Sequence, residues 1–371
     1  MPTRRTYLAG LAAASLAGLA GCSGVVGSGA DVAGDDAAEQ ASTGTPPVDA
    51  PEVGTPPVAD TSLHLGHTTT ALREQIMDGG PGKDGIPSID DPGLVGPDGT
   101  DLSDESPVFG VAFDDDVRAY PQSVLVWHEI VNDIVGDVPV SITYCPLTGT
   151  AMGFFRGETE FGVSGRLVNN NLVMYDRATD SFWQQVAATS IDGTHEGASL
   201  REFRVVWTTW GAWRERHPES SVLSTDTGFA RDYTRDPYGS YAPRSGYYQR
   251  SNGETLFPTL RSDDRLPAKA VVMGARTPDG AIAFEKATLR EAGVATGNVG
   301  EIEVVAVHDP VLDTAYVYRT DGATVEAAGA GTARVDGERH PVGSLPLNSV
   351  YTFDAMWFAW VGFYPDTGLV R

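Results

Sequence analysis

The chain of 371 residues holds 50 acidic and 26 basic side chains, which give a formal net charge of −24 at pH 7. Such a charge repels phosphate groups and therefore excludes nucleic acid as a partner. Only three lysines are present. This acidic, lysine-poor composition is typical of halophilic proteins, which stay soluble in concentrated salt because ions screen the repulsion between like charges.

The first 22 residues carry the features of an export signal. They contain paired arginines, Arg4 and Arg5, then a short apolar stretch, and they end in Leu-Ala-Gly-Cys at Cys22. The apolar stretch is too short to span a bilayer as a helix, and paired arginines indicate the export route for folded proteins. We therefore predict a twin-arginine lipoprotein signal over residues 1–22. Lipidation of Cys22 would anchor the exported protein to the outer face of the cytoplasmic membrane.

A disordered tether is predicted for residues 23–60. This stretch is acidic, rich in Ala, Pro and Thr, and contains the sequence GTPPV twice. It cannot bury enough apolar surface to offset the conformational entropy lost on folding. The membrane, reached through Cys22, is thus the partner that this end of the chain predicts.

The remaining residues predict two related β-rich halves. Residues 108–154 align without a gap on residues 272–318, and residues 165–183 resemble residues 343–360 more weakly. Each copy alternates short strands with Asp- and Gly-rich turns and contains one short helix. This pattern favours a mainly β fold with short helices, in which two barrel-like or sandwich-like halves arose by internal duplication.

The predicted boundaries are a first half over 61–200, a helical and loop connector over 201–265, and a second half over 266–371. Within the connector, tryptophans spaced three apart predict a helix that is begun by Thr208 or Thr209 and ends at Pro218. We expect these side chains to pack in the core: Trp207, Trp210 and Trp213.

The two copies differ in chemistry at two aligned places. His128 and Cys145 of the first copy correspond to Ala292 and Asp309 of the second. Because shared residues serve the common fold, residues that only one copy carries are candidates for function. The first half is therefore the expected location of a site.

Three interpretations of Cys145 remain open. It could bind copper or zinc together with His128, with Glu129 or His308 completing the ligand set. It could be a nucleophilic or redox-active thiol whose pKa is lowered by His128. It could also be a small buried side chain that packs at the end of a strand.

Two further stretches are candidates for lining a ligand site. Lys83, one of the three lysines, stands beside Asp84, and a lysine kept in such a chain suggests a need for its compact ammonium group. Arg231, Asp232 and Tyr233 fall on a loop between the two copies, where ligand sites are common. The alternative for both stretches is a hydrogen-bonded turn network.

With these stretches assembled, the chain resembles a bacterial and archaeal family, domain of unknown function 3179. The resemblance covers residues 77–367 and implies a fold but no reaction. The family usually reads Cys-Pro-Leu-Cys-Gly where this chain has Thr148 in place of the second cysteine. One thiol cannot close a local disulfide, so a dithiol switch is excluded here. The segments that carry the resemblance are GGPGKDGIPSIDDP, VRAYPQSVLVWHEIVNDIVGDVPVSITYCPLTGTAMGF, GVSGRLVNNNLVMYDRATDSFWQQ, RDYTRDPYGSY, RLPAK and MWFAWVGFYPDT.

The sequence therefore predicts a membrane-anchored, extracytoplasmic protein that binds a metal or another ligand through its first half. An enzyme that uses a single activated cysteine, Cys145 with His128, is the first alternative. A structural or interaction module is the second.

Overall fold

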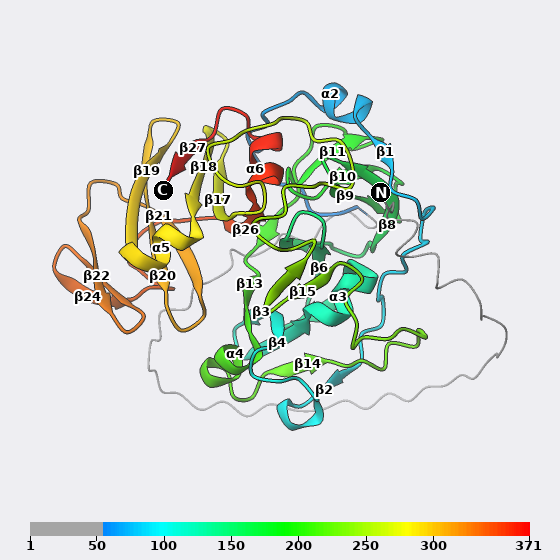
Figure 1. Ribbon diagram of the computed structural model, residues 1–371, viewed down its shortest axis with the longest axis horizontal. Coiled ribbons are helices and arrows are strands. Elements are labelled where there is room, and N and C mark those ends of the chain that lie inside the picture. The colour runs from blue at the N-terminus through cyan, green and yellow to red at the C-terminus, as the bar shows by residue number, and fades with distance from the viewer. Residues whose placement is uncertain (1–54) are drawn as a thin grey trace, which may run out of the picture.

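Figure 1 shows the computed structural model, in which residues 55–371 are described. The signal predicted for residues 1–22, its lipidation site Cys22 and nearly all of the tether predicted for residues 23–60 lie outside these residues. Within residues 55–371, no helix combines the length and the apolar character that crossing a bilayer requires.

The first half contains two sheets with two short helices. One sheet has the order β13-β3-β4-β14-β2 and the other has the order β12-β7-β6-β5. The helix that follows β4 packs against strands of both sheets. The bounds are β2 (Leu94–Val95), β3 (Pro107–Phe113), β4 (Asp116–Pro121), α3 (Gln122–His128), β5 (Ile130–Val135), β6 (Val138–Cys145), β7 (Thr150–Phe155), β12 (Glu202–Phe203), β13 (Val206–Thr209), α4 (Trp210–Arg216) and β14 (Ser221–Leu223).

Two further sheets and two short helical segments complete this part of the chain. Strands β8 to β11 are inserted between β7 and β12 and form a five-stranded sheet with β1, in the order β1-β8-β9-β10-β11, and β15 pairs with β16 in a hairpin. Their bounds are α2 (Thr69–Glu74), β1 (Met77–Asp78), the 3-10 helix η2 (Pro97–Gly99), β8 (Phe161–Val168), β9 (Asn171–Asp176), β10 (Phe182–Gln184), β11 (Thr189–Asp192), β15 (Gly239–Tyr241) and β16 (Arg244–Gly246).

The second half has sheets of order β26-β17-β18-β27 and β19-β20-β21-β25, with a smaller sheet of order β22-β23-β24. The smaller sheet lies at the outer left edge in Figure 1. The bounds are β17 (Val271–Thr277), β18 (Gly280–Glu285), α5 (Lys286–Ala292), β19 (Val294–Val299), β20 (Ile302–Asp309), β21 (Thr314–Arg319), β22 (Val325–Gly329), β23 (Thr332–Val335), β24 (Glu338–Pro341), β25 (Ser349–Val350), β26 (Thr352–Met356), α6 (Trp357–Phe363) and β27 (Gly368–Val370).

The two halves repeat the same arrangement. Every element from β3 to β7 has a counterpart of equal length from β17 to β21, 164 residues further along the chain. The unit β13-α4-β14 then corresponds to β26-α6-β27, and its last strand pairs in parallel with β4 in one half and with β18 in the other. The prediction of a mainly β fold with short helices is confirmed. The sheets of the described residues are open rather than closed into barrels, and the duplication itself stays a prediction.

A tryptophan packed on a glycine is common to both halves. A Cβ atom on Gly110 would come within 2.3 Å of the Trp213 ring, and one on Gly274 within 2.2 Å of the Trp360 ring. Each indole N–H donates to a hydroxyl seven residues further on, over 2.9 Å in both cases. These matched contacts explain why strands β3 and β17 each carry a glycine in mid-strand, where glycine is otherwise unfavourable.

Two parts of the repeat prediction require correction. Residues 165–183 run through β8 to β10 of the inserted sheet, whereas residues 343–360 run through β25 and β26 into α6, so the weaker match is wrong. The predicted connector contains β12, β13 and β14, which are strands of the first half's own sheets. Helix α4 begins after Thr209, whose side chain accepts a hydrogen bond from the backbone of Ala212, and Trp207 lies in β13 before it.

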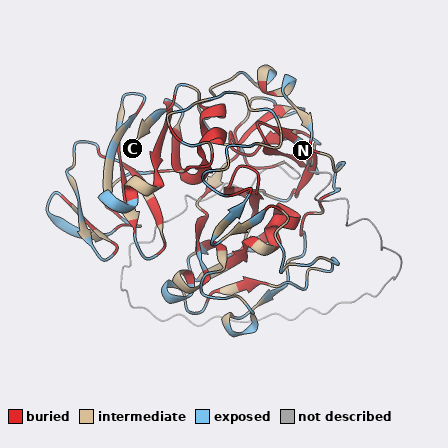
Figure 2. Cartoon of the chain, viewed as in Figure 1, coloured by how far each residue is buried: buried red, intermediate tan, exposed pale blue. Residues whose placement is uncertain are grey.

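One hydrophobic core extends through both halves. The largest buried cluster includes Tyr144 and Phe154 of the first half and Phe353 and Trp357 of the second. In Figure 2, buried residues fill the middle of the molecule, and exposed residues follow β22 to β24 at its edge. Because the two halves pack through this core, side chains from both can contribute to one site.

Candidate functional site

Cys145 is the last residue of β6 and is 1% exposed. Its thiol lies 3.5 Å from the carbonyl oxygen of Asn170, to which the S–H can donate. Three residues later, the carbonyl of Thr148 accepts a hydrogen bond from the backbone N–H of Met356, at the start of α6. The turn after Cys145 is thus covered by the second half, and the thiol is enclosed in the core.

His128 ends α3 and is fully buried. Its Nδ1 lies 2.8 Å from the carbonyl oxygen of Pro87, and its Nε2 lies 2.7 Å from the hydroxyl of Tyr233. A carbonyl can only accept, so Nδ1 carries the proton and Nε2 accepts from Tyr233. Burial lowers the pKa of His128 to about 4, which keeps the imidazole neutral. Both ring nitrogens are occupied, and the predicted pairing of His128 with Cys145 is not formed.

The predicted copper or zinc site is not assembled either. Across residues 55–371, no group of three or more His, Cys, Asp and Glu side chains is arranged to hold a metal ion. Glu129 is buried at the C-cap of α3, with a backbone φ of 60°. His308 lies in the second half, where its Nε2 is 3.2 Å from a carboxylate oxygen of Asp313. Cys145, His128, Glu129 and His308 therefore do not share one ligand sphere.

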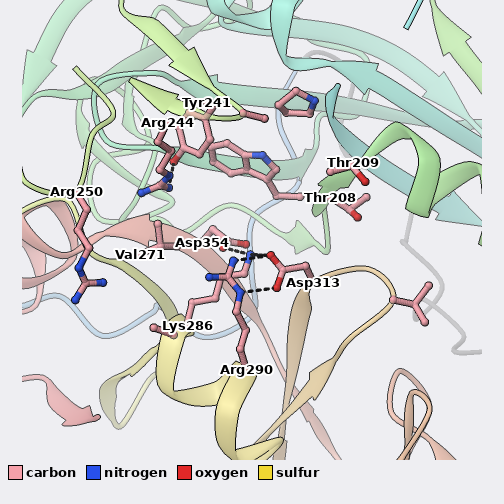
Figure 3. Close-up of a pocket in the computed structure, with 15 residues that line it drawn as sticks. Thr208, Thr209, Tyr241, Arg244, Arg250, Val271, Lys286, Arg290, Asp313 and Asp354 are labelled. Carbon is pink, nitrogen blue, oxygen red and sulfur yellow. Dashed lines mark hydrogen bonds and ion pairs between the residues drawn. The ribbon is translucent and has the colours of Figure 1, made fainter. Parts of the chain in front are cut away.

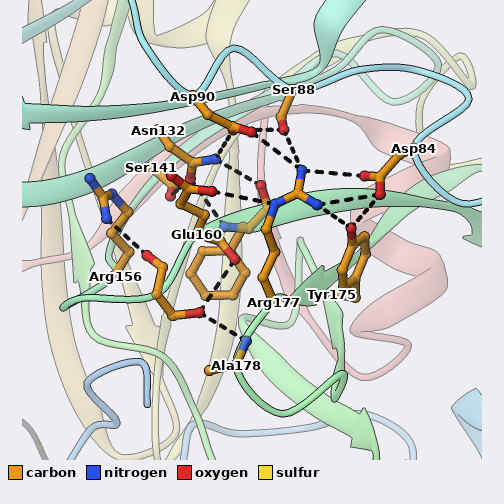
Figure 4. A network of polar contacts seen from close by, with 12 residues as sticks. Asp84, Ser88, Asp90, Asn132, Ser141, Arg156, Glu160, Tyr175, Arg177 and Ala178 are labelled. Atoms are coloured by element: carbon orange, nitrogen blue, oxygen red, sulfur yellow. Dashed lines mark hydrogen bonds and ion pairs between the residues drawn. The ribbon is translucent and has the colours of Figure 1, made fainter. Parts of the chain in front are cut away.

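Asp84 belongs to a surface network centred on Arg177 (Figure 4), and Lys83 lies beside this network, against the Tyr175 ring. Asp84 accepts hydrogen bonds from Tyr175 over 2.6 Å and from Arg177 over 3.3 Å. The ammonium of Lys83 pairs with Asp180 and lies 3.9 Å from the centre of the Tyr175 ring. These contacts fasten the segment that carries Lys83 and Asp84 to β9. Both side chains also line an open pocket, so their role in a ligand site stays a prediction.

The loop with Arg231, Asp232 and Tyr233 lies beside His128. Asp232 accepts hydrogen bonds from the backbone and hydroxyl of Thr234 and so shapes a local turn. Tyr233 links Thr227 to His128 through its hydroxyl. This loop covers α3. The three residues predicted to line a ligand site lie outside the pocket that opens between the two halves.

A pocket of about 340 Å³ opens between the two halves (Figure 3). One side is formed by β13 and the β15–β16 hairpin, and the other by α5 with the β20–β21 turn. Its lining is apolar or aromatic near Trp207 and Tyr241, and charged near α5. The lining residues are Pro107, Trp207, Thr208, Thr209, Tyr241, Ala242, Arg244, Arg250, Val271, Lys286, Ala287, Arg290, Val311, Asp313 and Asp354.

Ion pairs hold most of the cations of this pocket in place. Lys286 donates to Asp354 over 2.7 Å, and both side chains are buried. Arg290 donates two hydrogen bonds to Asp313, over 2.7 and 2.6 Å, and Figure 3 shows these groups directed toward one another. A bidentate arginine–carboxylate pair fixes both the position and the plane of the guanidinium.

Two lining groups have shifted pKa values. Burial opposes ionisation of Asp313, but hydrogen bonds from Arg290 and His308 outweigh it and hold the pKa of this carboxyl well below its usual range. Burial raises the pKa of Tyr241 to about 12. Asp313 is therefore ionised and Tyr241 is protonated throughout the neutral range.

Comparison with models of protein families shows to which family the chain is related. A model described as "Protein of unknown function (DUF3179)" matches residues 83–367. The chain belongs to this family. Searches of curated proteins and of solved structures gave no match. The matched span of this DUF3179 protein includes Cys145, His128 and the whole pocket.

Thr148 stands where the resemblance described above leads us to expect a second cysteine. Its hydroxyl lies 2.9 Å from that of Thr150 and accepts a hydrogen bond from Asn171 over 2.8 Å, and all three side chains are buried. Thr148 therefore serves as a polar partner inside the core of this family member.

The charged side of the pocket was not predicted from the sequence. One signal was available, because Lys286 is one of only three lysines in the chain and is therefore as exceptional as Lys83. No pattern connects Lys286 with Arg244 or Arg250, which come from different elements. Their convergence follows only from how the two halves pack.

Proposed function

We propose that this DUF3179 protein is exported, anchored by lipid at Cys22, and binds a small organic anion in the pocket between its halves. The pocket carries the binding proposal, because four cationic side chains line it in a chain whose net charge is −24. The N-terminal pattern supports the anchor. A binding role is favoured over catalysis because Asp313 stays ionised and Tyr241 stays protonated at neutral pH, so neither is suited to proton transfer there.

Removing one cation from the pocket is expected to weaken anion binding. Arg250 suits the test because its side chain is 48% exposed, so its replacement leaves no cavity in the core, although its partner Glu285 loses an ion pair. In Arg250→Gln, we expect the affinity for benzoate, succinate or phosphate, whichever binds best, to fall about three- to tenfold, which corresponds to a loss of about 1 kcal/mol. Isothermal titration calorimetry at a fixed KCl concentration measures this directly.

Arg319→Gln is the matched control, since Arg319 is 44% exposed and pairs with Asp321, neither of which lines the pocket. It removes the same charge from the protein. Equal losses of affinity in both variants would show a nonspecific charge effect. Failure of all three anions to bind the unmodified protein would refute the binding proposal.

The anchor has a separate test in the producing cells. Replacing Cys22 with Ser removes the thiol that would carry the lipid. We expect the variant to be released into the medium while the unmodified protein remains with the membrane fraction, as measured by immunoblotting of the two fractions. Retention of Cys22→Ser in the membrane at the unmodified level would contradict lipid anchoring.

A further inference from the structure

Arg244 differs from the other cations of the pocket. Arg250, Lys286 and Arg290 each form an ion pair with a carboxylate. Within residues 55–371, Arg244 forms none. It donates instead to the hydroxyl of Tyr241 over 2.9 Å and to the carbonyl of Lys269 over 3.3 Å. A guanidinium has five N–H donors, so several remain for a ligand.

The charges around the pocket indicate a ligand with a single negative charge. Its four cations are accompanied by three carboxylates: Asp313 and Asp354 in the lining, and Glu285 paired with Arg250. The excess is one positive charge, and Arg244 carries it. A carboxylate matches this excess, whereas a phosphate group carries a charge of about −1.5 to −2 at neutral pH. Arginine also matches a carboxylate geometrically, because its donors form a planar fork.

The side of the pocket near Arg244 is aromatic. The ring centres of Trp207 and Tyr241 lie 4.5 Å apart with an interplanar angle of 38°, and the Arg244 guanidinium lies 4.5 Å from the centre of the Tyr241 ring. Such a wall favours a flat partner, since offset stacking adds to the area that is buried. The volume of about 340 Å³ lies at the lower end for ligand sites and indicates a small molecule.

We propose that the ligand is a small planar carboxylic acid whose carboxylate binds the Arg244 guanidinium and whose flat body lies against the aromatic wall of Trp207 and Tyr241. This inference rests on the proposed function and specifies its ligand class. The carboxylate replaces water on the free donors of Arg244, while the ion pairs of Lys286 and Arg290 keep the opposite wall charged. Binding therefore requires both halves of the protein.

Comparing the affinities for benzoate and cyclohexanecarboxylate tests the effect of planarity at constant charge, because both are monoanions of similar size and only benzoate is flat. For the full-length protein in detergent at fixed KCl, we expect benzoate to bind about three- to tenfold more tightly by calorimetry. In Arg244→Gln, benzoate affinity should fall at least about tenfold, while Arg319→Gln should leave it unchanged.

Two outcomes would refute the proposed ligand class without refuting the proposal that the pocket binds an anion. One is equal affinity for benzoate and cyclohexanecarboxylate. The other is tighter binding of inorganic phosphate that is lost in Arg250→Gln. Unchanged benzoate affinity in Arg244→Gln would overturn the assigned carboxylate position. If no probe binds the unmodified protein, the proposed function fails together with the inference.

Discussion

Replacing Arg276 with Met is expected to destabilise the protein by about 3–5 kcal/mol, because it leaves a carboxylate buried without its cation. Arg276 lies in β17 and is 2% exposed. Its guanidinium donates two hydrogen bonds to Glu202 of β12, both over 2.8 Å, and others to Tyr364 and to the carbonyl of Val186. The pair joins a strand of the second half to a strand of the first.

The measurement is denaturant unfolding at fixed salt, with Arg276→Met compared with the double variant Arg276→Met/Glu202→Met. Replacing both partners of a buried pair with apolar side chains is often nearly neutral, so the double variant should recover most of the lost stability. A double variant as unstable as the single one would show that the hydrogen bonds to Tyr364 and Val186 matter more than the ion pair.

Stability should fall as the pH drops from about 6.5 to about 4 because of His128. The pKa of this imidazole is lowered from 6.5 to about 4, chiefly by burial. In this pH window the unfolded chain binds a proton that the folded protein cannot bind, so acid favours unfolding. The contribution of the neutral His128 imidazole to the free energy of unfolding is complete above pH 6.5 and is lost progressively below it. A shift of this size corresponds to about 3 kcal/mol.

Other groups titrate in the same pH window, so the effect of His128 on stability must be isolated by comparison with a variant that lacks the imidazole. His128→Gln keeps a polar side chain but cannot be protonated. We expect it to be less stable than the unmodified protein at pH 7, and the difference in free energy of unfolding to shrink by about 3 kcal/mol at pH 4. A difference that stays constant with pH would contradict a buried, neutral His128.

Much of the fold could be predicted from the sequence, because the relevant signals are local. The alignment of residues 108–154 on 272–318 matches the structure element by element from β3 to β7 and from β17 to β21. Strand alternation, turn residues and one helix per copy are set by neighbouring positions. The alignment failed where an insertion separates the matching elements, since β12, β13 and β14 lie beyond the four inserted strands β8 to β11.

The candidate site was much less predictable. His128 and Cys145 differ between the copies, which made them candidates, but a sequence does not show which groups its side chains meet. In the structure, the carbonyl of Pro87 and the hydroxyl of Tyr233 occupy both nitrogens of His128. The charged residues that do converge on the pocket are of ordinary types, which form no recognisable motif in the sequence. They also come from separate elements of the fold.

The sequence by itself determined the family, the mainly β character and the repeated order of elements, because these depend on local patterns and on motifs that run along the chain. Only the tertiary structure decided that Cys145 is enclosed, that His128 is neutral, and that Arg244 faces Lys286 and Arg290 across one pocket. The physical reason is that burial and the meeting of charges depend on how the halves pack, and that packing brings together residues far apart in the chain.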